Sequence, residues 1–263
     1  MQTGTSSKEP EPTVHILSAP NHGEQERHFP SPIEVLTSLS RPPYFLLVRG
    51  TCDSIGSGPV EKLLVAASLF GRPHATGTVK MSRTRVRIDA DVARRTGPVT
   101  HYSRTSLPLP AHTDSTTMDV PHDLVAFCMI RPDPAGGDSF VVSSADVLKA
   151  TSPSDVALLK TPVSFGKRSY PVLSQGVDPA IRYYEAQIDR GSMDRDTAAV
   201  LSRLDALLAQ PGLQHRFRLQ AGDVLFLNNR KALHGRTGFS ADSDRLMHRF
   251  RIHVPALSMR GGM

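Results

Sequence analysis

A histidine and an aspartate, His112 and Asp114, stand two residues apart in the run Leu107-Pro-Leu-Pro-Ala-His-Thr-Asp-Ser115. In an extended strand, side chains at i and i+2 point to the same face, so this imidazole and this carboxylate can meet at one point. A mixed nitrogen and oxygen pair suits a borderline divalent metal such as Fe(II), Mn(II) or Zn(II). The same tripeptide also arises as a surface histidine and aspartate on a loop, so a metal site requires a further ligand.

A third candidate ligand, His234, lies downstream, just past the expected end of an apolar strand over 223–227. Taken alone, His234 could equally be a structural histidine that is satisfied by a hydrogen bond. Two arginines follow it, Arg245 and Arg249, and they are four residues apart. A guanidinium group grips a carboxylate through two parallel hydrogen bonds, which makes a bound acid a candidate partner for Arg249.

A strand is expected over 246–254, and its geometry determines on which face the side chain of Arg249 lies. Because side chains alternate along a strand, Met247, Arg249 and Arg251 would share one face, and His248 would lie on the other. If the first face points inward, Arg249 is a buried cation, and a buried charge needs a partner. An ion pair with an aspartate of the chain is the structural alternative to a bound acid.

Together these segments resemble the Fe(II)/2-oxoglutarate-dependent oxygenases of the taurine dioxygenase and clavaminate synthase type. The likeness extends from about Tyr44 to Val254, and the matched pieces run in the order that the family has. The pieces are His112-x-Asp114, Gly136-Gly-Asp-Ser139, Gly222-Asp-Val-Leu-Phe226, His234-Gly-Arg236 and Arg245-x3-Arg249.

The resemblance implies a double-stranded β-helix, a cupin-like jelly roll, that uses Fe(II), 2-oxoglutarate as co-substrate, and O2. It implies a facial triad of metal ligands: His112, Asp114 and His234. It further implies that Arg249 pairs with the distal carboxylate of 2-oxoglutarate, that Arg245 assists it, and that the hydroxyl of Ser139 contacts the same co-substrate. Other residues could line the pocket or only pack, namely Arg104, Met118, Arg182, Tyr183 and Asn229.

The activity implied by the resemblance is hydroxylation of an unactivated C–H in a small polar metabolite, such as an amino acid or a derivative of one. Desaturation, cyclisation and epoxidation use the same cofactors and stay open, as does a carrier-bound substrate. Halogenation is not expected, because Asp114 supplies the carboxylate that halogenating relatives lack. A non-catalytic β-barrel that binds a metal or a small acid is the alternative outside enzymes, and the joint presence of the triad and the arginine disfavours it.

Composition bounds the architecture that must position these residues. The chain has 263 residues with 19 glycines and 21 prolines, which favours many turns and short strands over a helix bundle. We expect a mainly β, α+β chain with peripheral helices, organised as a disordered leader over 1–13 and one domain over 14–263. Strands are expected at 44–48, 79–88, 124–130, 139–143, within 170–188, and at 214–219, 223–227 and 246–254; helices are expected at 31–39, 59–70, 144–148, 152–159 and 194–210.

The net charge, the apolar runs and the cysteine content indicate which kinds of partner and which compartment to expect. The net charge is +6, but the basic residues are scattered, so we expect a small-molecule substrate and no nucleic acid. No apolar run approaches the ~18 residues of a membrane span, so no membrane partner is expected. The two cysteines, Cys52 and Cys128, are too few for a disulfide scaffold, which favours a cytoplasmic protein. The oligomeric state stays open, a homo-oligomer included.

Overall fold

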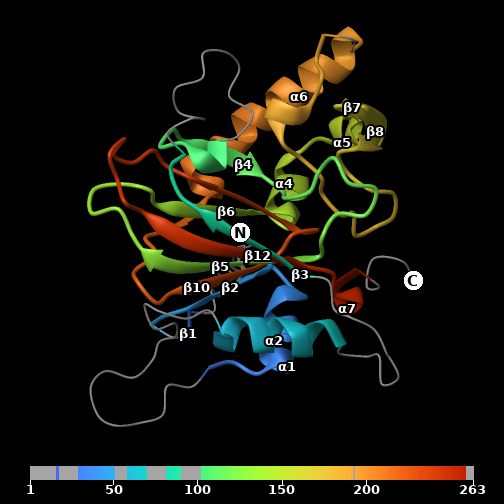
Figure 1. Ribbon diagram of the computed structural model, residues 1–263. Helices are drawn as coiled ribbons and strands as arrows, with labels where there is room; N and C mark the ends of the chain where they lie inside the picture. The colour runs from blue at the N-terminus through green and yellow to red at the C-terminus, as the bar shows by residue number, and fades with distance from the viewer. Residues whose placement is uncertain are drawn as a thin grey trace, which may run out of the picture.

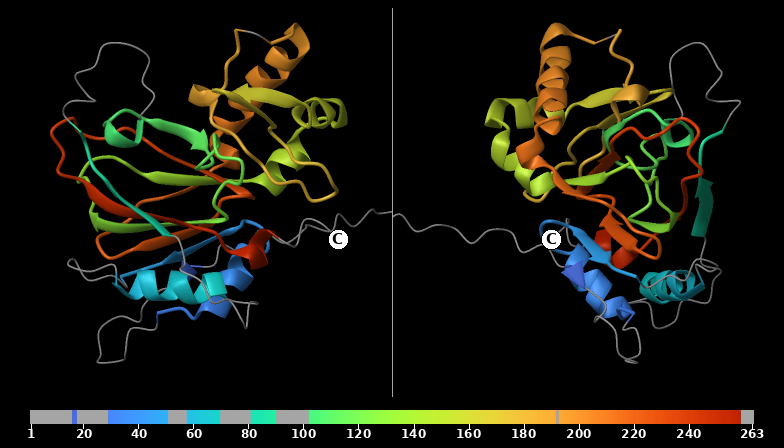
Figure 2. Two further views of the ribbon diagram at one scale, coloured as in Figure 1. Left: turned by 45° about the vertical axis from the view of Figure 1, so that its right-hand side comes forward. Right: turned by 90° about the vertical axis from the view of Figure 1, so that its left-hand side faces the viewer.

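The computed structural model describes residues 16–17, 29–50, 58–69, 81–89, 102–191 and 193–258. Within these ranges, two β-sheets face each other, and helices cover the outer face of each sheet (Figures 1 and 2). The expected leader and Cys52 lie outside the described residues. No helix among the described ranges is both long enough and apolar enough to cross a membrane.

The larger sheet has six strands in the order β1-β2-β10-β5-β12-β3. Neighbouring strands are antiparallel except β1 and β2, which are parallel. In sheet order the strands are β1 (Ile16–Leu17), β2 (Phe45–Val48), β10 (Val224–Asn228), β5 (Leu124–Arg131), β12 (Leu246–Ile252) and β3 (Met81–Val86).

The smaller sheet has four antiparallel strands in the order β4-β11-β6-β9. These are β4 (Leu109–His112), β11 (Ala232–Arg236), β6 (Ser139–Ser143) and β9 (His215–Phe217). A separate hairpin pairs β7 (Pro162–Phe165) with β8 (Arg168–Pro171). The described residues also contain three short 3-10 helices: η1 (Tyr102–Arg104), η2 (Glu185–Gln187) and η3 (Pro211–Leu213).

Four of the helices begin after a residue whose side chain caps a free N–H group. Ser31 caps α1 (Pro32–Leu39) in a reciprocal arrangement with Glu34, and Asp194 accepts a hydrogen bond from the Thr197 N–H of α6 (Arg195–Leu208) at 2.9 Å. Helices α1, α2 (Gly58–Leu69) and α7 (Pro255–Ser258) cover the larger sheet. Helices α4 (Ser144–Ala150), α5 (Pro153–Leu159) and α6 cover the smaller one.

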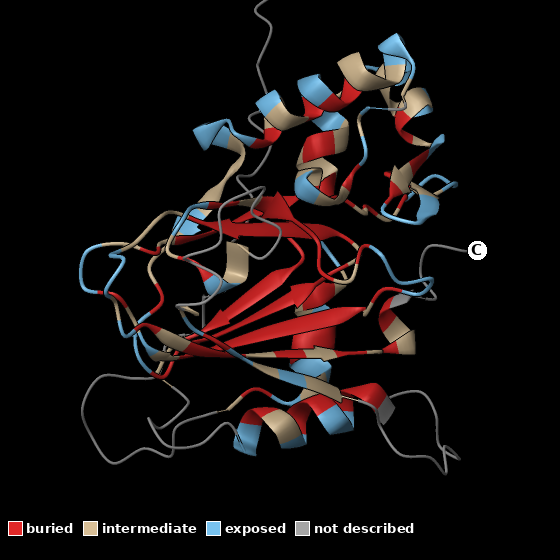
Figure 3. Cartoon of the chain, turned by 45° about the horizontal axis from the view of Figure 1, so that its top comes forward, coloured by how far each residue is buried: buried red, intermediate tan, exposed pale blue. Residues whose placement is uncertain are grey.

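Strand β5 shows why the sequence produces these layers. Its Leu124, Ala126 and Cys128 pack against the α1 and α2 helices, while Val125 and Phe127 pack between the two sheets. A strand covered on both faces needs apolar residues at every position, which is the continuous run that the sequence has. The central strands of the two sheets are accordingly buried, whereas the outer faces of the helices are exposed (Figure 3).

Most expected elements are confirmed, and 124–130 forms the central strand β5. Of the two faces of β12, the one that carries Met247 and Arg249 points inward. The strand material expected within 170–188 is limited to the end of β8 and two isolated bridges, followed by η2. The strand expected over 79–88 is β3, an edge strand that pairs with β12. His234 lies past the end of β10, as expected, but on a further strand, β11, that was not expected.

Candidate metal centre

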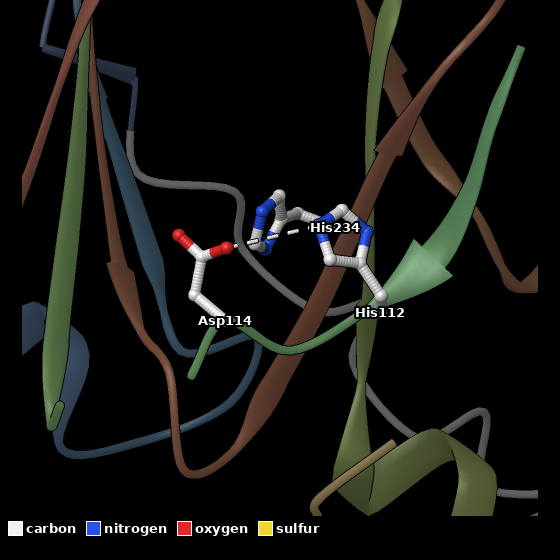
Figure 4. A group of neighbouring side chains, drawn as sticks. All are labelled: His112, Asp114 and His234. Atoms are coloured by element: carbon white, nitrogen blue, oxygen red, sulfur yellow. Dashed lines mark ion pairs between the residues drawn. The ribbon is translucent and has the colours of Figure 1, made fainter. Parts of the chain in front are cut away.

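Three predicted ligands converge on one point between the sheets. One potential ligand atom from each of His112, Asp114 and His234 lies within 4.8 Å of the other two. Figure 4 shows the three side chains turned toward one another, with His112 Nε2 3.9 Å from Asp114 Oδ1. All three residues are buried. His112 and Asp114 meet as their spacing predicts, and His234 joins them as the family resemblance implies.

Strand pairing brings the two histidines together. His112 on β4 and His234 on β11 are direct partners in the antiparallel register, and their ring centroids are 4.3 Å apart. The residue after His234 must be a glycine, because a Cβ at Gly235 would lie 2.6 Å from the carbonyl oxygen of Leu109 and would overlap the ring of Phe140. Close approach of β4, β11 and β6 therefore depends on that missing side chain.

Hydrogen bonds from two other segments hold the tripeptide that carries His112 and Asp114. Thr113 N–H donates to the carbonyl of Tyr183 at 2.8 Å, and Tyr183 N–H donates to Thr113 Oγ1 at 3.1 Å. Asn229 accepts from Asp114 N–H at 2.7 Å and donates to the Asp114 carbonyl at 3.0 Å. The backbone on both sides of the ligands is thus fixed although β4 ends at His112.

The protonation states suit a divalent cation. Burial lowers the pKa of His112, and burial and the neighbouring His112 lower the pKa of His234 well below its ordinary value, so both imidazoles are neutral. Burial opposes ionisation of Asp114, but the positive surroundings, first of all the charge of Arg249, outweigh it and lower the pKa of Asp114 to about 2. Metal binding needs neutral imidazoles and an ionised carboxylate.

Atoms of the three side chains that make no hydrogen bond are also consistent with a bound metal ion. His112 Nδ1 donates to the carbonyl of Pro110 at 2.9 Å, which leaves Nε2 with a free lone pair. Asp114 Oδ2 and His234 Nδ1 are buried and have no hydrogen-bond partner among the described residues. Buried polar atoms are rarely left unpaired, and coordination of a cation would satisfy such a set.

The two predicted arginines differ in their surroundings. Arg249 Nη1 donates to Asp114 Oδ1 at 3.1 Å. Of the two partners that the sequence leaves possible for Arg249, the structure therefore shows the aspartate of the chain. Arg245 is 2 % exposed, and no carboxylate among the described residues lies within ion-pair distance of it. Its Nε is buried without a partner, and burial lowers its pKa to about 10. Arg245 is therefore a buried cation that only a more distant charge, that of Asp133, balances in part.

A third buried arginine, Arg236, has a structural role. It donates to the carbonyls of Leu107 at 2.6 Å and Tyr102 at 3.0 Å, and so anchors the segment that leads into β4. Its guanidinium lies 4.5 Å from the ring centroid of Phe239, which also faces Arg245 at 5.2 Å. Backbone carbonyls thus satisfy Arg236 without a ligand.

Two cavities adjoin the three converging side chains. The arginine cavity is lined by Ser139, His234, Arg245 and mainly apolar neighbours. The loop cavity is lined by the segment 113–118 after His112 and by side chains from 184–187 and β12. His112 and Arg249 line both cavities. The candidate metal centre therefore lies where two binding spaces meet.

Comparison with known families accounts for this arrangement. The family model described as taurine catabolism dioxygenase TauD, TfdA family matches residues 34–164 and 168–251. The chain belongs to this family. As a TauD/TfdA-family member, it is an oxygenase that depends on Fe(II) and 2-oxoglutarate, and its two-sheet core is the double-stranded β-helix of the family.

Solved structures with the same fold include an asparagine oxygenase and a non-heme iron oxygenase. The crystal structure of asparagine oxygenase (AsnO) has a TM-score of 0.67 at 22% identity and covers 85% of this chain and 78% of its own. The non-heme iron oxygenase OrfP in complex with Fe and alpha-ketoglutaric acid has a TM-score of 0.61 at 17% identity, and the match covers 85% of this chain and 79% of OrfP. PvcB from Pseudomonas aeruginosa has a TM-score of 0.59 at 18% identity, and the match covers 84% of this chain and 80% of PvcB. At these identities the likeness establishes the fold alone.

The structure places the remaining sequence candidates in different roles. Asn229 and Tyr183 hold the ligand-bearing tripeptide, Met118 lines the loop cavity, and Arg104 pairs with Asp89 at the surface. Arg182 donates to the carbonyls of Thr116, Met118 and Asp119 and so anchors the loop after Asp114. The residues of the loop cavity that were missed as site residues include Tyr184, Gln187 and Arg251. Arg251 could have been found, since it shares the strand face of Arg249.

Proposed function

We propose that this TauD/TfdA-family protein hydroxylates an unactivated C–H of a small polar metabolite, an amino acid or a derivative of one. Residues 14–263 would act as one catalytic domain, with His112, Asp114 and His234 as the Fe(II) ligands. The observation that carries the proposal is the position of these buried, incompletely bonded side chains at the junction of two cavities. One cavity can hold the co-substrate and the other the metabolite.

We assign the arginine cavity to 2-oxoglutarate. Its distal carboxylate would pair with Arg245, a buried guanidinium with no carboxylate of the described chain within ion-pair distance, and would accept a hydrogen bond from Ser139. This differs from the assignment that the resemblance implies, because Arg249 is already bonded to Asp114. Arg249 would instead orient that carboxylate ligand and keep it ionised.

When bound together, Fe(II) and 2-oxoglutarate supply the chemistry that activates O2 and removes hydrogen from a C–H bond, with succinate and carbon dioxide as co-products. The chain positions the groups that do this. The hydrogen bond from His112 Nδ1 to Pro110 fixes the ring so that Nε2 faces the metal position. The ring of Phe127, 5.0 Å from that of His234, and the apolar lining of the arginine cavity exclude water.

The loop cavity supports a small polar substrate. Its lining is rich in hydroxyl, amide and guanidinium groups, among them Thr116, Tyr184, Gln187 and Arg251. Proteins of the same fold also act on amino acids, since solved structures contain asparagine oxygenase with 3-hydroxyasparagine and succinate, and OrfP with (3S)-hydroxy-L-Arg. Both observations favour an amino acid or a derivative over a large apolar substrate.

A substrate screen tests the proposal. The protein, reconstituted with Fe(II) under anaerobic conditions, receives 2-oxoglutarate, O2 and individual amino acids or derivatives, and succinate and product mass are measured. We expect succinate release coupled to a mass gain of one oxygen atom for at least one candidate. A product lighter by two hydrogens would indicate desaturation or cyclisation, and no coupled turnover on any small polar acid would refute the proposal. His215→Ala, a half-buried histidine away from the triad, should retain activity, whereas His112→Ala should not.

A further inference from the structure

One cation of the loop cavity is not used by the candidate metal centre. Arg251 follows Arg249 by two residues on β12, so both guanidinium groups project from the same face of the strand, and both line the loop cavity. Asp114 is the only carboxylate among the described residues of this lining. Because Arg249 is bonded to Asp114, Arg251 adds a positive charge to the cavity wall without a carboxylate to balance it.

The contacts of Arg251 leave part of its hydrogen-bonding capacity unused. Its Nη2 donates to Ser82 Oγ on the neighbouring strand β3 at 3.1 Å, which fixes one end of the guanidinium plane. Its Nε is buried, and no acceptor for it lies among the described residues. A buried donor without an acceptor is costly, and a ligand that brings oxygen acceptors would remove that cost.

Other groups of the same cavity also favour a ligand with acceptor atoms. Thr116 Oγ1 donates to Gln187 Oε1, so the carboxamide oxygen of Gln187 is engaged and its NH2 is the group left to bind a ligand. The ring of Tyr184 lies 4.9 Å from that of His112, which places an aromatic wall beside the metal position. A small anion held at Arg251 would therefore lie in the same space as the candidate metal ligands.

We propose that Arg251 binds the carboxylate of the substrate that is oxidised, and that it restricts the enzyme to small molecules bearing a free carboxylate. The inference rests on the proposed function and names the group by which its substrate is recognised. It also separates two acids, because 2-oxoglutarate is assigned to Arg245 in the arginine cavity and the substrate to Arg251 in the loop cavity. A planar guanidinium matches a carboxylate better than an ammonium does.

The test pairs each proteinogenic L-amino acid with its α-amide, which has no carboxylate. Wild type, Arg251→Gln and Arg251→Lys are compared, with Arg85→Gln as the matched control. Arg85 is an exposed arginine of β3 that pairs in register with His248, and so lies on the strand face away from the cavity. Succinate release gives KM for each probe and for 2-oxoglutarate, and calorimetry measures binding of the acid to the anaerobic Fe(II) and 2-oxoglutarate complex.

We expect wild type to act on one or more acids and not on their amides. Arg251→Gln should raise KM and weaken calorimetric binding of the acid by roughly ten- to a hundredfold, with less than a twofold change in KM for 2-oxoglutarate. Arg251→Lys should lie between the two, and Arg85→Gln should match wild type. Equal turnover of acids and amides, or unchanged KM in Arg251→Gln, would overturn this inference alone. Absence of succinate release by wild type with every probe would instead refute the proposed function and this inference with it.

Discussion

Replacing Arg245 by glutamine removes the buried cation that we assign to the distal carboxylate of 2-oxoglutarate. Arg245 is 2 % exposed and has no carboxylate of the described chain within ion-pair distance, so its charge is available to a bound anion. Truncating one partner of a buried, hydrogen-bonded charge pair costs about 2–5 kcal/mol. At 1.4 kcal/mol per tenfold change, that range corresponds to a loss of affinity of roughly 30-fold to a few thousand-fold.

Calorimetric titration of the anaerobic Fe(II) protein with 2-oxoglutarate measures this loss directly. Arg249→Gln is the matched comparison, because it removes the same group four residues later from a side chain that is already bonded to Asp114. We expect Arg245→Gln to weaken 2-oxoglutarate binding more strongly than Arg249→Gln. Arg245→Lys should restore only part of the affinity, since an ammonium lacks the planar fork. Unchanged affinity in Arg245→Gln with a large loss in Arg249→Gln would refute the assignment and return the distal carboxylate to Arg249.

Three other perturbations test the scaffold and the chemistry. Gly235→Ala should destabilise the fold by about 1–3 kcal/mol or more, because the added Cβ would lie 2.6 Å from the carbonyl oxygen of Leu109. The measurement is the thermal unfolding midpoint, which should fall. An unchanged midpoint would show that β4 and β11 can move apart without cost. Asn229→Ala removes two buried hydrogen bonds to the Asp114 backbone. It should lower the free energy of unfolding by about 2 kcal/mol and weaken Fe(II) binding. An unchanged free energy of unfolding together with unchanged Fe(II) affinity would show that Asn229 is dispensable. Turnover in the presence of chloride should give no chlorinated product, since Asp114 occupies the ligand position that a halide would need; a chlorinated mass would contradict this.

The local parts of the candidate site could be predicted from the sequence. The meeting of His112 and Asp114 across a two-residue spacing, and the shared strand face of Met247 and Arg249, depend only on strand geometry. Which face of that strand points inward was left open. The strand that carries His234 was not expected, because a polar run separates His234 from the apolar strand over 223–227. In the structure that run is a tight turn closed by the Lys231 N–H bond to Asn228 at 3.0 Å, and β11 begins directly after it.

Long-range pairing could not be predicted from the sequence. Whether Arg249 meets Asp114 or a bound acid depends on how the two sheets stack, and no spacing along the chain specifies that. The limited strand content of 170–188 has a related cause. Its apolar residues, such as Val172 and Leu173, are buried against the helices that cover the smaller sheet, and tertiary packing of that kind does not require a regular strand.

The most direct test of the metal centre is an anaerobic Fe(II) titration of wild type and of the single variants His112→Ala, Asp114→Ala and His234→Ala. Wild type should bind one Fe(II) per chain, and each variant should lose most of that affinity while its circular dichroism spectrum stays native, because each side chain is one of three ligands at a preformed site. His215→Ala controls for loss of a histidine elsewhere. Near-normal Fe(II) binding in all three variants would contradict the assignment of the metal to this site.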